Sequence, residues 1–297
     1  MTKVKLKNIV SNTPIYVPLF IFTLFCIVPF IVVVSGSFSD NATVVSNGVR
    51  LFPQVFSLTA YKVIFAFFSK ITRAYGVAIF VTVIGTVLNL IIMVPFAFAI
   101  SKREFTFGAK LTFLIYFTVM FSGGLIPTYI LIKRYLGLYD TVWVLILPLL
   151  ASPSYIVLLR VFFQSVPKAL YESAAIDGAN EFQQLIHVGI PLALPGIAAI
   201  AFFSMLMYWN DPYTAIIYIE DSELFPIQIL LTQMTQYINY IKSNASASGG
   251  LISSPADIPT TTILFALGIV ASGPMIFVFS FFQKYFIKGL TAGSVKE

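Results

Sequence analysis

The chain has 297 residues, of which 58% are hydrophobic and only 10% are charged, and its mean hydropathy is +0.92. Soluble domains carry about 25% charged residues, so this composition excludes a soluble protein and indicates a membrane protein. The net charge of +6 is spread along the loops without a stripe of cations and aromatic rings, which argues against nucleic acid as a partner. The single cysteine, Cys26, excludes a disulfide framework and a cysteine metal site.

Six apolar runs predict an all-α integral membrane protein with six transmembrane helices, because each run has the roughly 20 residues that a helix needs to cross a bilayer. The runs are 15–35, 74–100, 109–131, 142–163, 193–219 and 261–283. Three lysines before the first run resemble the start of a signal peptide. The apolar run is too long for one and no good cleavage site follows, so we interpret it as an uncleaved first span.

Six spans place both termini on one side of the membrane. Ten lysines and arginines fall on that side and seven fall in the longer loops of the other side, so the positive-inside rule predicts cytoplasmic termini. Lys133 and Arg134, close to a span end on the other side, speak against this orientation. The predicted divisions are an N-terminal region with the first span and an outer loop, a transmembrane domain and a cytoplasmic tail, over residues 1–73, 74–285 and 286–297.

Two spans carry unusual residues. The third contains two glycines and a proline within 121–127, which indicates a close helix approach or a broken helix. The fourth contains Arg160 near its predicted cytoplasmic end, where a long side chain extends to the membrane surface.

The loop 167–191 is the most informative polar stretch and is predicted to form two short helices. Ser165 is expected to cap the first helix, and Gly178 to end it, since glycine accepts the left-handed backbone of a helix terminus. Residues 180–183 have the pattern of a capping box that starts the second helix, and Pro191 is expected to close it. A small rigid elbow of this kind is suited to docking a partner protein.

The fifth span ends in a cluster of aromatic and polar residues. We expect it to line a substrate path, because aromatic rings offer stacking surfaces and polar groups replace the water that a polar substrate loses. Packing of a helix interface is the alternative, and a further alternative places Asp211 in the headgroup region beside an aromatic belt. The cluster consists of Tyr208, Trp209, Asn210, Asp211 and Tyr213. The long polar loop 220–260 that follows is the candidate contact for an external protein.

Catalytic chemistry is not expected from this sequence. It contains no phosphate-binding Gly-x-x-x-x-Gly-Lys-Ser/Thr loop, so no ATP site, cofactor or metal site is predicted in this chain. The one histidine, His187, lies on the polar loop and is expected to be a solvated surface residue.

The polar loop resembles the signature of ABC-importer permeases, which reads Glu-Ala-Ala, three residues, Gly, and a spacer ending in Ile-x-Leu-Pro. The matching residues are Glu172, Ala174, Gly178, Val188, Ile190 and Pro191, with Ser173 replacing the first alanine and Ile190 replacing leucine. Residues 97–102 and 209–211 resemble maltose-type permeases. Residues 121–129 and 288–296 resemble the subgroup for oligosaccharides from polysaccharides, whereas 75–77 departs from the usual Asn-Ser pair.

This resemblance implies a type I ABC importer permease fold with a coupling helix in the loop 167–191. It implies a subunit in a bacterial plasma membrane that imports a sugar, with an oligosaccharide as the expected cargo, and is not itself an enzyme. The cluster at the end of the fifth span is then expected to line the sugar path, since sugars stack on aromatic rings. The implied partners are a second, homologous permease in a heterodimer, two ATP-binding subunits that hold ATP and magnesium, an extracytoplasmic sugar-binding protein and membrane lipid. The residues implied at the ATPase contact are Glu172, Ser173, Ala174, Ala175, Asp177, Gly178, Ile190 and Pro191.

Two alternatives remain open at this point. The first is an ABC permease for another class of solute. The second is an ion-coupled secondary transporter, although such proteins usually keep several paired carboxylates or bases in the membrane and this chain offers only Asp211 and Arg160.

Overall fold

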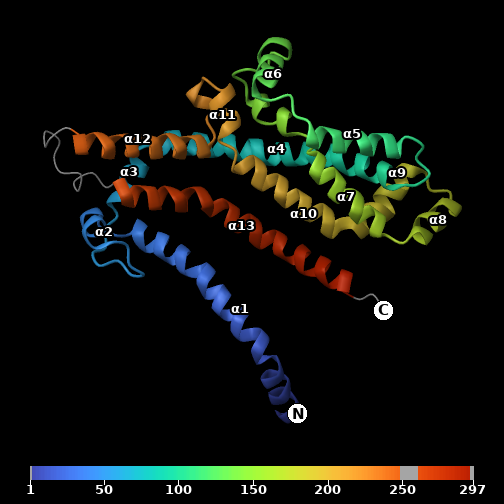
Figure 1. Cartoon of the computed structure of the whole chain (residues 1–297), viewed down its shortest axis with the longest axis horizontal. Coiled ribbons are helices and arrows are strands. Elements are labelled where there is room, and N and C mark those ends of the chain that lie inside the picture. The colour runs from blue at the N-terminus through green and yellow to red at the C-terminus, as the bar shows by residue number, and fades with distance from the viewer. Residues whose placement is uncertain (1, 248–259, 295–297) are drawn as a thin grey trace. The chain divides into compact units, whose positions relative to one another are not determined.

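The computed structural model describes residues 2–247 and 260–294. In that part of the chain the regular elements are helices, and the only strand-like pairing is an isolated antiparallel bridge between Ser39 and Phe56 (Figure 1). The predicted all-α class is therefore confirmed. The chain forms two compact units, residues 1–68 with 233–273 and residues 69–232 with 274–297.

The first unit contains the first apolar helix and a short outer segment. From Tyr16 onward, α1 is exposed along most of its length, as an apolar helix that faces lipid or a partner would be. Asp40 caps α2 by accepting hydrogen bonds from the backbone of Ala42 and Thr43. The helices of this unit are α1 (Thr2–Ser37), α2 (Asn41–Asn47), α3 (Thr59–Ala66), most of α12 (Ile227–Ala247) and the first part of α13 (Thr260–Ser294).

The second unit is built around α4 (Phe68–Ser101). One apolar cluster packs the second half of α4 against α5, α7 and the start of α10, and another packs its first half against η1, η2, the end of α10 and α11. The other elements of this unit are α5 (Gly108–Met120), α6 (Leu125–Ile130), η1 (Leu131–Tyr135), η2 (Val142–Leu145), η3 (Leu147–Leu149), α7 (Pro153–Ser165), α8 (Lys168–Ile176), α9 (Glu181–Gln184), η4 (Leu185–Gly189), α10 (Ile190–Trp209), α11 (Tyr213–Tyr218) and η5 (Ser222–Leu224).

The described residues hold four helices long and apolar enough to cross a membrane, and six spans if two bent pairs each count as one. The third predicted span is broken: α5 and the α6–η1 segment meet at an angle of 109°, with Gly124 at φ +84° between them. The break agrees with the glycine-rich sequence there. The fourth span bends by 51° between η3 and α7.

The fifth span differs from the prediction at both ends. A continuous helix runs from Glu181 to Trp209, and α11 follows it as a separate short helix. Pro191 was therefore predicted wrongly to close the second loop helix. It lies in the first turn of α10, directly after the π-helical turn η4, whose hydrogen bonds already depart from the α pattern. Within this continuous helix proline has no N–H to donate to the turn before it, and the π-helical turn η4 is the local departure that accompanies this missing bond.

A buried hydrogen-bond network joins three spans in the middle of this unit. The Asn89 amide donates to the Tyr208 hydroxyl over 3.2 Å, and its oxygen accepts from the backbone N–H of Ala151 over 2.7 Å. The Tyr208 hydroxyl donates to the carbonyl of Ile146 over 3.2 Å. The ring of Tyr208 lies against Gly85, where a Cβ would come within 2.6 Å of it. Glycine at this position thus permits α4 and α10 to approach closely.

Candidate functional site

The polar loop forms a compact elbow made of α8, a turn and α9 (residues 168–184), which we call the α8–α9 elbow. Gly178 has φ +84°, a backbone conformation that favours glycine, so the prediction that Gly178 ends the first helix of the loop is confirmed. The Ala179 N–H donates to the carbonyl of Ala174, and the Gly178 N–H donates to that of Ala175. These two bonds form a Schellman motif, which closes the end of α8 tightly.

The second arm of the elbow begins as predicted. The Asn180 side chain accepts from the Gln183 backbone, and the Gln183 side chain accepts from the Asn180 backbone, each over 2.9 Å. This reciprocal pair is a capping box. The prediction for the first arm was wrong, because Ser165 is the last residue of α7 and its hydroxyl donates to the carbonyl of Phe162. Pro167 stands at the start of α8 instead.

The surface of α8 is open, since none of its residues is buried. Ile176 at its end is 87% exposed, far more than a large aliphatic side chain usually is in a folded protein. The predicted residues Glu172, Ser173, Ala174, Ala175, Asp177 and Gly178 all lie on α8 or its C-terminal turn. Ile190 and Pro191 do not lie there; they belong to the first turn of α10.

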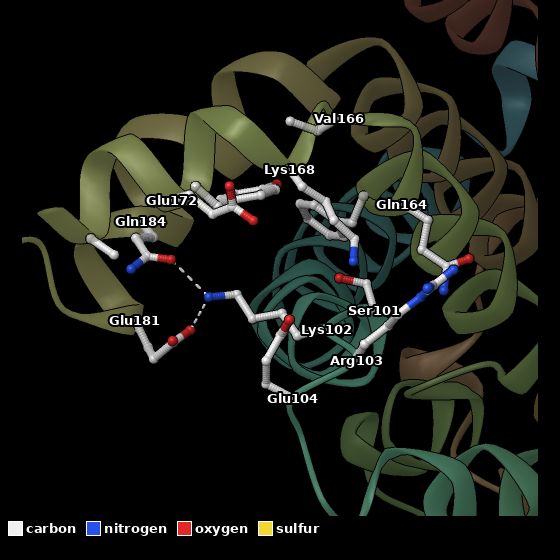
Figure 2. Close-up of a pocket in the computed structure, with 13 residues that line it drawn as sticks. Ser101, Lys102, Arg103, Glu104, Gln164, Val166, Lys168, Glu172, Glu181 and Gln184 are labelled. Atoms are coloured by element: carbon white, nitrogen blue, oxygen red, sulfur yellow. Dashed lines mark hydrogen bonds and ion pairs between the residues drawn. The ribbon is translucent and has the colours of Figure 1, made fainter.

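Lys102, just after the end of α4, holds the elbow from the inside. Its ammonium pairs with the carboxylate of Glu181 and donates to the Gln184 side chain over 2.8 Å (Figure 2). It also lies 4.7 Å above the ring of Phe98 and 5.6 Å from that of Tyr171. The lysine therefore contacts both arms of the elbow and the end of α4.

Two further contacts join neighbouring helices to the same end of α4. Tyr171 of α8 packs its ring edge-on against Phe98, with 5.7 Å between the ring centres. Arg160 of α7 donates from Nε to the carbonyl of Ile100 over 3.1 Å. Burial raises the pKa of the Tyr171 hydroxyl, which has no hydrogen-bond partner among the residues that the structure describes, so this side chain contributes packing.

A pocket of about 490 Å³ opens between the elbow and the turn that follows α4. Three cations, Lys102, Arg103 and Lys168, and three carboxylates, Glu104, Glu172 and Glu181, line it (Figure 2). The two sets of charges balance, so the pocket does not favour a ligand of one sign. This arrangement is suited to a protein surface with mixed charges.

The predicted sugar-path cluster is divided by the structure. Tyr208 and Trp209 are 4% and 3% exposed, and Trp209 packs on Tyr75 with 6.1 Å between the ring centres. Asn210 and Tyr213 are exposed. Asp211 caps α11 by accepting from the backbone of Tyr213 over 3.0 Å.

A second cluster of charges and rings lies where α4 begins, at the end of the unit away from the elbow. The ammonium of Lys133 is 3.6 Å from the ring centre of Tyr139 and 3.1 Å from the Tyr129 hydroxyl. The Tyr139 hydroxyl donates to Glu220 over 2.6 Å. That hydrogen bond, together with burial, raises the pKa of Tyr139 to about 12.

Sequence reasoning missed the roles of Lys102, Asn89 and Lys133. It treated the lysines as charges that set the topology and gave Asn89 no role, although an amide in the centre of an apolar run is a signal for a buried hydrogen-bond partner. His187 is exposed as expected, with Nδ1 3.0 Å from the carbonyl of Gln183. Within the described part of the chain, no three His, Cys, Asp or Glu side chains come together as metal ligands would.

Comparisons with known proteins give a consistent result over the whole chain. It is 40% identical to the polygalacturonan/rhamnogalacturonan transport system permease protein YtcP of Bacillus subtilis, over 98% of this chain and 100% of the relative. It is 30% identical to the trehalose transport system permease protein SugB of Mycobacterium tuberculosis, over 92% of this chain and 93% of the relative. No protein-family model matches.

A solved structure has the same fold. One chain of a bacterial ABC transporter involved in the import of the acidic polysaccharide alginate superposes with a TM-score of 0.77 and 31% identity, over 96% of this chain and 98% of the other. The bent third and fourth spans and the α8–α9 elbow therefore belong to a chain that matches this structure over nearly its full length.

Proposed function

Because this chain belongs to the permease subunits of ABC importers for sugars and oligosaccharides, we propose that the α8–α9 elbow is where it receives motion from an ATP-hydrolysing partner. The chain is a multi-pass membrane protein and a transport subunit rather than an enzyme, and such permeases work with ATPase and binding-protein partners. The observation that carries the proposal is the elbow itself, a rigid and uncovered helix closed by a Schellman motif.

The proposed contact residues fit a docking role. Glu172, Ser173, Ala175 and Asp177 are exposed, and Ile176 adds an uncovered apolar side chain between them. Small residues permit close approach of another backbone, and a buried isoleucine contributes about 1.5–3 kcal/mol to a contact. We assign Ile190 and Pro191 a different part: they carry movement of the elbow into α10.

The orientation and the partners of the subunit are proposed on the same basis. We propose that the end of the unit with the elbow faces the cytoplasm of a bacterium, that both termini lie on that side, and that ATP and magnesium are held by two ATPase subunits. A second, homologous permease completes the path in a heterodimer. An extracytoplasmic sugar-binding protein docks on the opposite side, where the loop 220–260 is the proposed contact; residues 248–259 of that loop lie outside the described residues.

The proposed cargo is an oligosaccharide that carries uronate carboxylates. Galacturonan is a polymer of galacturonic acid, and alginate is an acidic polysaccharide by its printed description, so two of the similar proteins concern anionic sugars. The described residues at the end of the unit away from the elbow carry both signs of charge, since Arg73 pairs with Glu223 and Lys133 lies beside Tyr139, which binds Glu220. The proposal of an anionic cargo therefore rests on the similar proteins and not on the charge of this surface.

Within the predicted path cluster we assign two roles. Asn210, Asp211 and Tyr213, which are at least partly exposed, are proposed to contact sugar. Tyr208 and Trp209, which are buried, are proposed to hold that end of α10 in place. Uptake of a galacturonic acid oligomer, with a carboxyl-reduced neutral oligomer as competitor, tests the sugar class: weak competition supports an anionic cargo, and equal competition contradicts it.

Substitution of Gly178 by valine tests the coupling assignment. A Cβ at Gly178 would meet no neighbour, so Gly178→Val acts only through the backbone strain of a β-branched residue at positive φ. Gly137→Val is the matched control, because Gly137 has φ +61° and also has free space around it, but lies away from the elbow. We expect Gly178→Val to lose ATPase co-purification and stimulated ATP hydrolysis, and Gly137→Val to keep both. Equal behaviour of the two variants would remove the assignment.

A further inference from the structure

Three helices are joined to α4 at one short segment, residues 98–102, which we call the α4 junction. Phe98 contacts Tyr171 of α8, Ile100 accepts a hydrogen bond from Arg160 of α7, and Lys102 binds Glu181 at the start of the continuous helix that includes α10. The elbow is covalently linked to α7 and α10 but not to α4. Its direct contacts with the end of α4 are therefore made by side chains, chiefly the ring contact of Phe98 and the ion pair of Lys102. α7 and α10 also pack on α4 through an apolar cluster.

Lys102 is the residue of this junction whose side chain contacts both arms of the elbow, Tyr171 on α8 and Glu181 and Gln184 on α9. Its side chain is only 16% exposed, whereas the paired Glu181 is 72% exposed. Gln184, the second partner, is 5% exposed, and its own amide donates to the carbonyl of Ala179 over 3.0 Å. The ammonium is thus fixed by an inner amide, an outer carboxylate and two aromatic rings (Figure 2).

Glu181 begins a helix of 29 residues that ends at Trp209. The helix is unbroken from Glu181 through η4 into α10, so a displacement of its first residue is passed along the backbone into the start of α10. We propose that Lys102 is a positioning residue that joins the end of α4 to the elbow, so that this end of α4 moves with the elbow when the ATPase displaces α8. This inference rests on the proposed coupling function of α8 and adds α4 to the part of the protein that moves.

The ion pair between Lys102 and Glu181 fixes the position of the elbow more than it adds to the folding stability of the subunit. An ion pair with a largely exposed carboxylate contributes little to folding, and its partners in the junction still pack without the charge. Removing the ammonium should therefore leave the subunit folded and the ATPase bound. What should change is how much sugar is moved for each ATP hydrolysed, because α8 can then move without α4.

The test uses the full complex of both permeases, ATPase and binding protein in proteoliposomes. Lys102→Met keeps the apolar stem and removes the charge, and Lys102→Arg keeps the charge. Lys110→Met is the matched control, since Lys110 is an exposed lysine of the neighbouring helix α5 whose ammonium lies 5.9 Å from the ring centre of its own helix cap, Phe107. The charge-reversed pair Lys102→Glu with Glu181→Lys tests whether the two residues act through each other.

We expect Lys102→Met to assemble normally and to lower sugar imported per ATP by roughly three- to tenfold, the range for a residue that couples two moving elements. Lys102→Arg and the charge-reversed pair should restore most of that ratio, and Lys110→Met should not alter it. An unchanged ratio in Lys102→Met, or a fall that the reversed pair does not restore, would overturn the proposal. Failure of the wild-type subunit to bind an ATPase would instead contradict the proposed function itself.

Discussion

The side chains of Asn89 and Tyr208 hydrogen bond to each other over 3.2 Å inside the bundle, and each also binds the backbone of the bent fourth span. Asn89 is fully buried and Tyr208 is 4% exposed. In an apolar interior a polar group is kept only when its partners are present. The pair therefore fixes the bend at 146–151 to α4 and α10.

Removal of Asn89 should destabilise the subunit more than removal of the Tyr208 hydroxyl. Asn89→Ala leaves the Ala151 N–H without its partner and also removes a fully buried side chain, so a cavity adds to the loss. Tyr208→Phe leaves the Asn89 amide without its acceptor, at about 1–3 kcal/mol for such a group, but keeps the ring in place and creates no cavity. Thermal unfolding of the purified subunit in detergent shows which variant loses more stability. Equal losses would mean that water replaces the missing amide, and no loss in either variant would contradict a structural role.

Replacing Ala151 by glycine should stabilise the subunit. It has φ +58°, a left-handed conformation that costs a non-glycine residue about 1–2 kcal/mol. Ala151→Gly should therefore raise the unfolding temperature, although the greater freedom of glycine in the unfolded chain offsets part of the gain. Ala199→Gly is the control, because Ala199 lies within α10 and glycine there costs about 1 kcal/mol. Two shifts of the same sign would contradict the strain at Ala151.

Local patterns of the sequence predicted those features that neighbouring residues decide. The turn at Gly178 and the capping box at 180–183 need only a short stretch of chain, and both are present. The prediction that Pro191 ends the helix was wrong. A proline indicates a helix end when the turn before it is assumed to be α-helical, and here that turn is π-helical. The π-helical turn η4 depends on packing of the whole span and leaves no local signal.

Contacts between distant segments could not be predicted from one sequence. Lys102 and Glu181 are 79 positions apart, and Asn89 and Tyr208 are 119 apart. Composition shows that each residue is polar in an apolar neighbourhood, but not which partner it finds. The apolar runs were found because a bilayer demands a fixed length of apolar helix, and the glycines and proline of the third run indicated its break. The angles of 109° and 51° could not be predicted, because they arise from tertiary packing.

The hydrogen bond between Tyr139 and Glu220 predicts that the folding stability of the subunit falls at alkaline pH. The Tyr139 hydroxyl donates to the carboxylate, which raises the pKa of Tyr139 from 10.0 to about 12. Because the pKa of Tyr139 is higher in the folded protein than in the unfolded chain, the protonated hydroxyl stabilises the fold. This contribution to folding stability is complete below pH 10.0 and is lost as the pH rises through about 12. Glu220→Gln should move the pKa of Tyr139 back toward that of a free tyrosine. The near-ultraviolet absorbance of tyrosinate, taken as the difference from Tyr139→Phe, checks this shift, and an unchanged titration would contradict the role of Glu220.

Ile176 predicts how the elbow binds its partner. Its side chain is 87% exposed in the isolated subunit, although it stands at the end of an ordered helix beside a rigid turn. Water around such a side chain is released when a partner covers it, which stabilises the contact by about 1.5–3 kcal/mol. Ile176→Ala should therefore weaken ATPase binding by roughly ten- to a hundredfold, at about 1.4 kcal/mol for each factor of ten.

The same substitution should leave the stability of the subunit unchanged, because the side chain packs against little in the folded chain. Ile216→Ala is the matched control: Ile216 is 49% exposed and lies on α11, away from the elbow. Binding of the purified ATPase to each subunit in nanodiscs, alongside thermal unfolding, separates the two effects. Normal ATPase affinity in Ile176→Ala would show that the partner does not cover the tip of α8. A loss of affinity in both variants would point to general misfolding instead of a contact at the elbow.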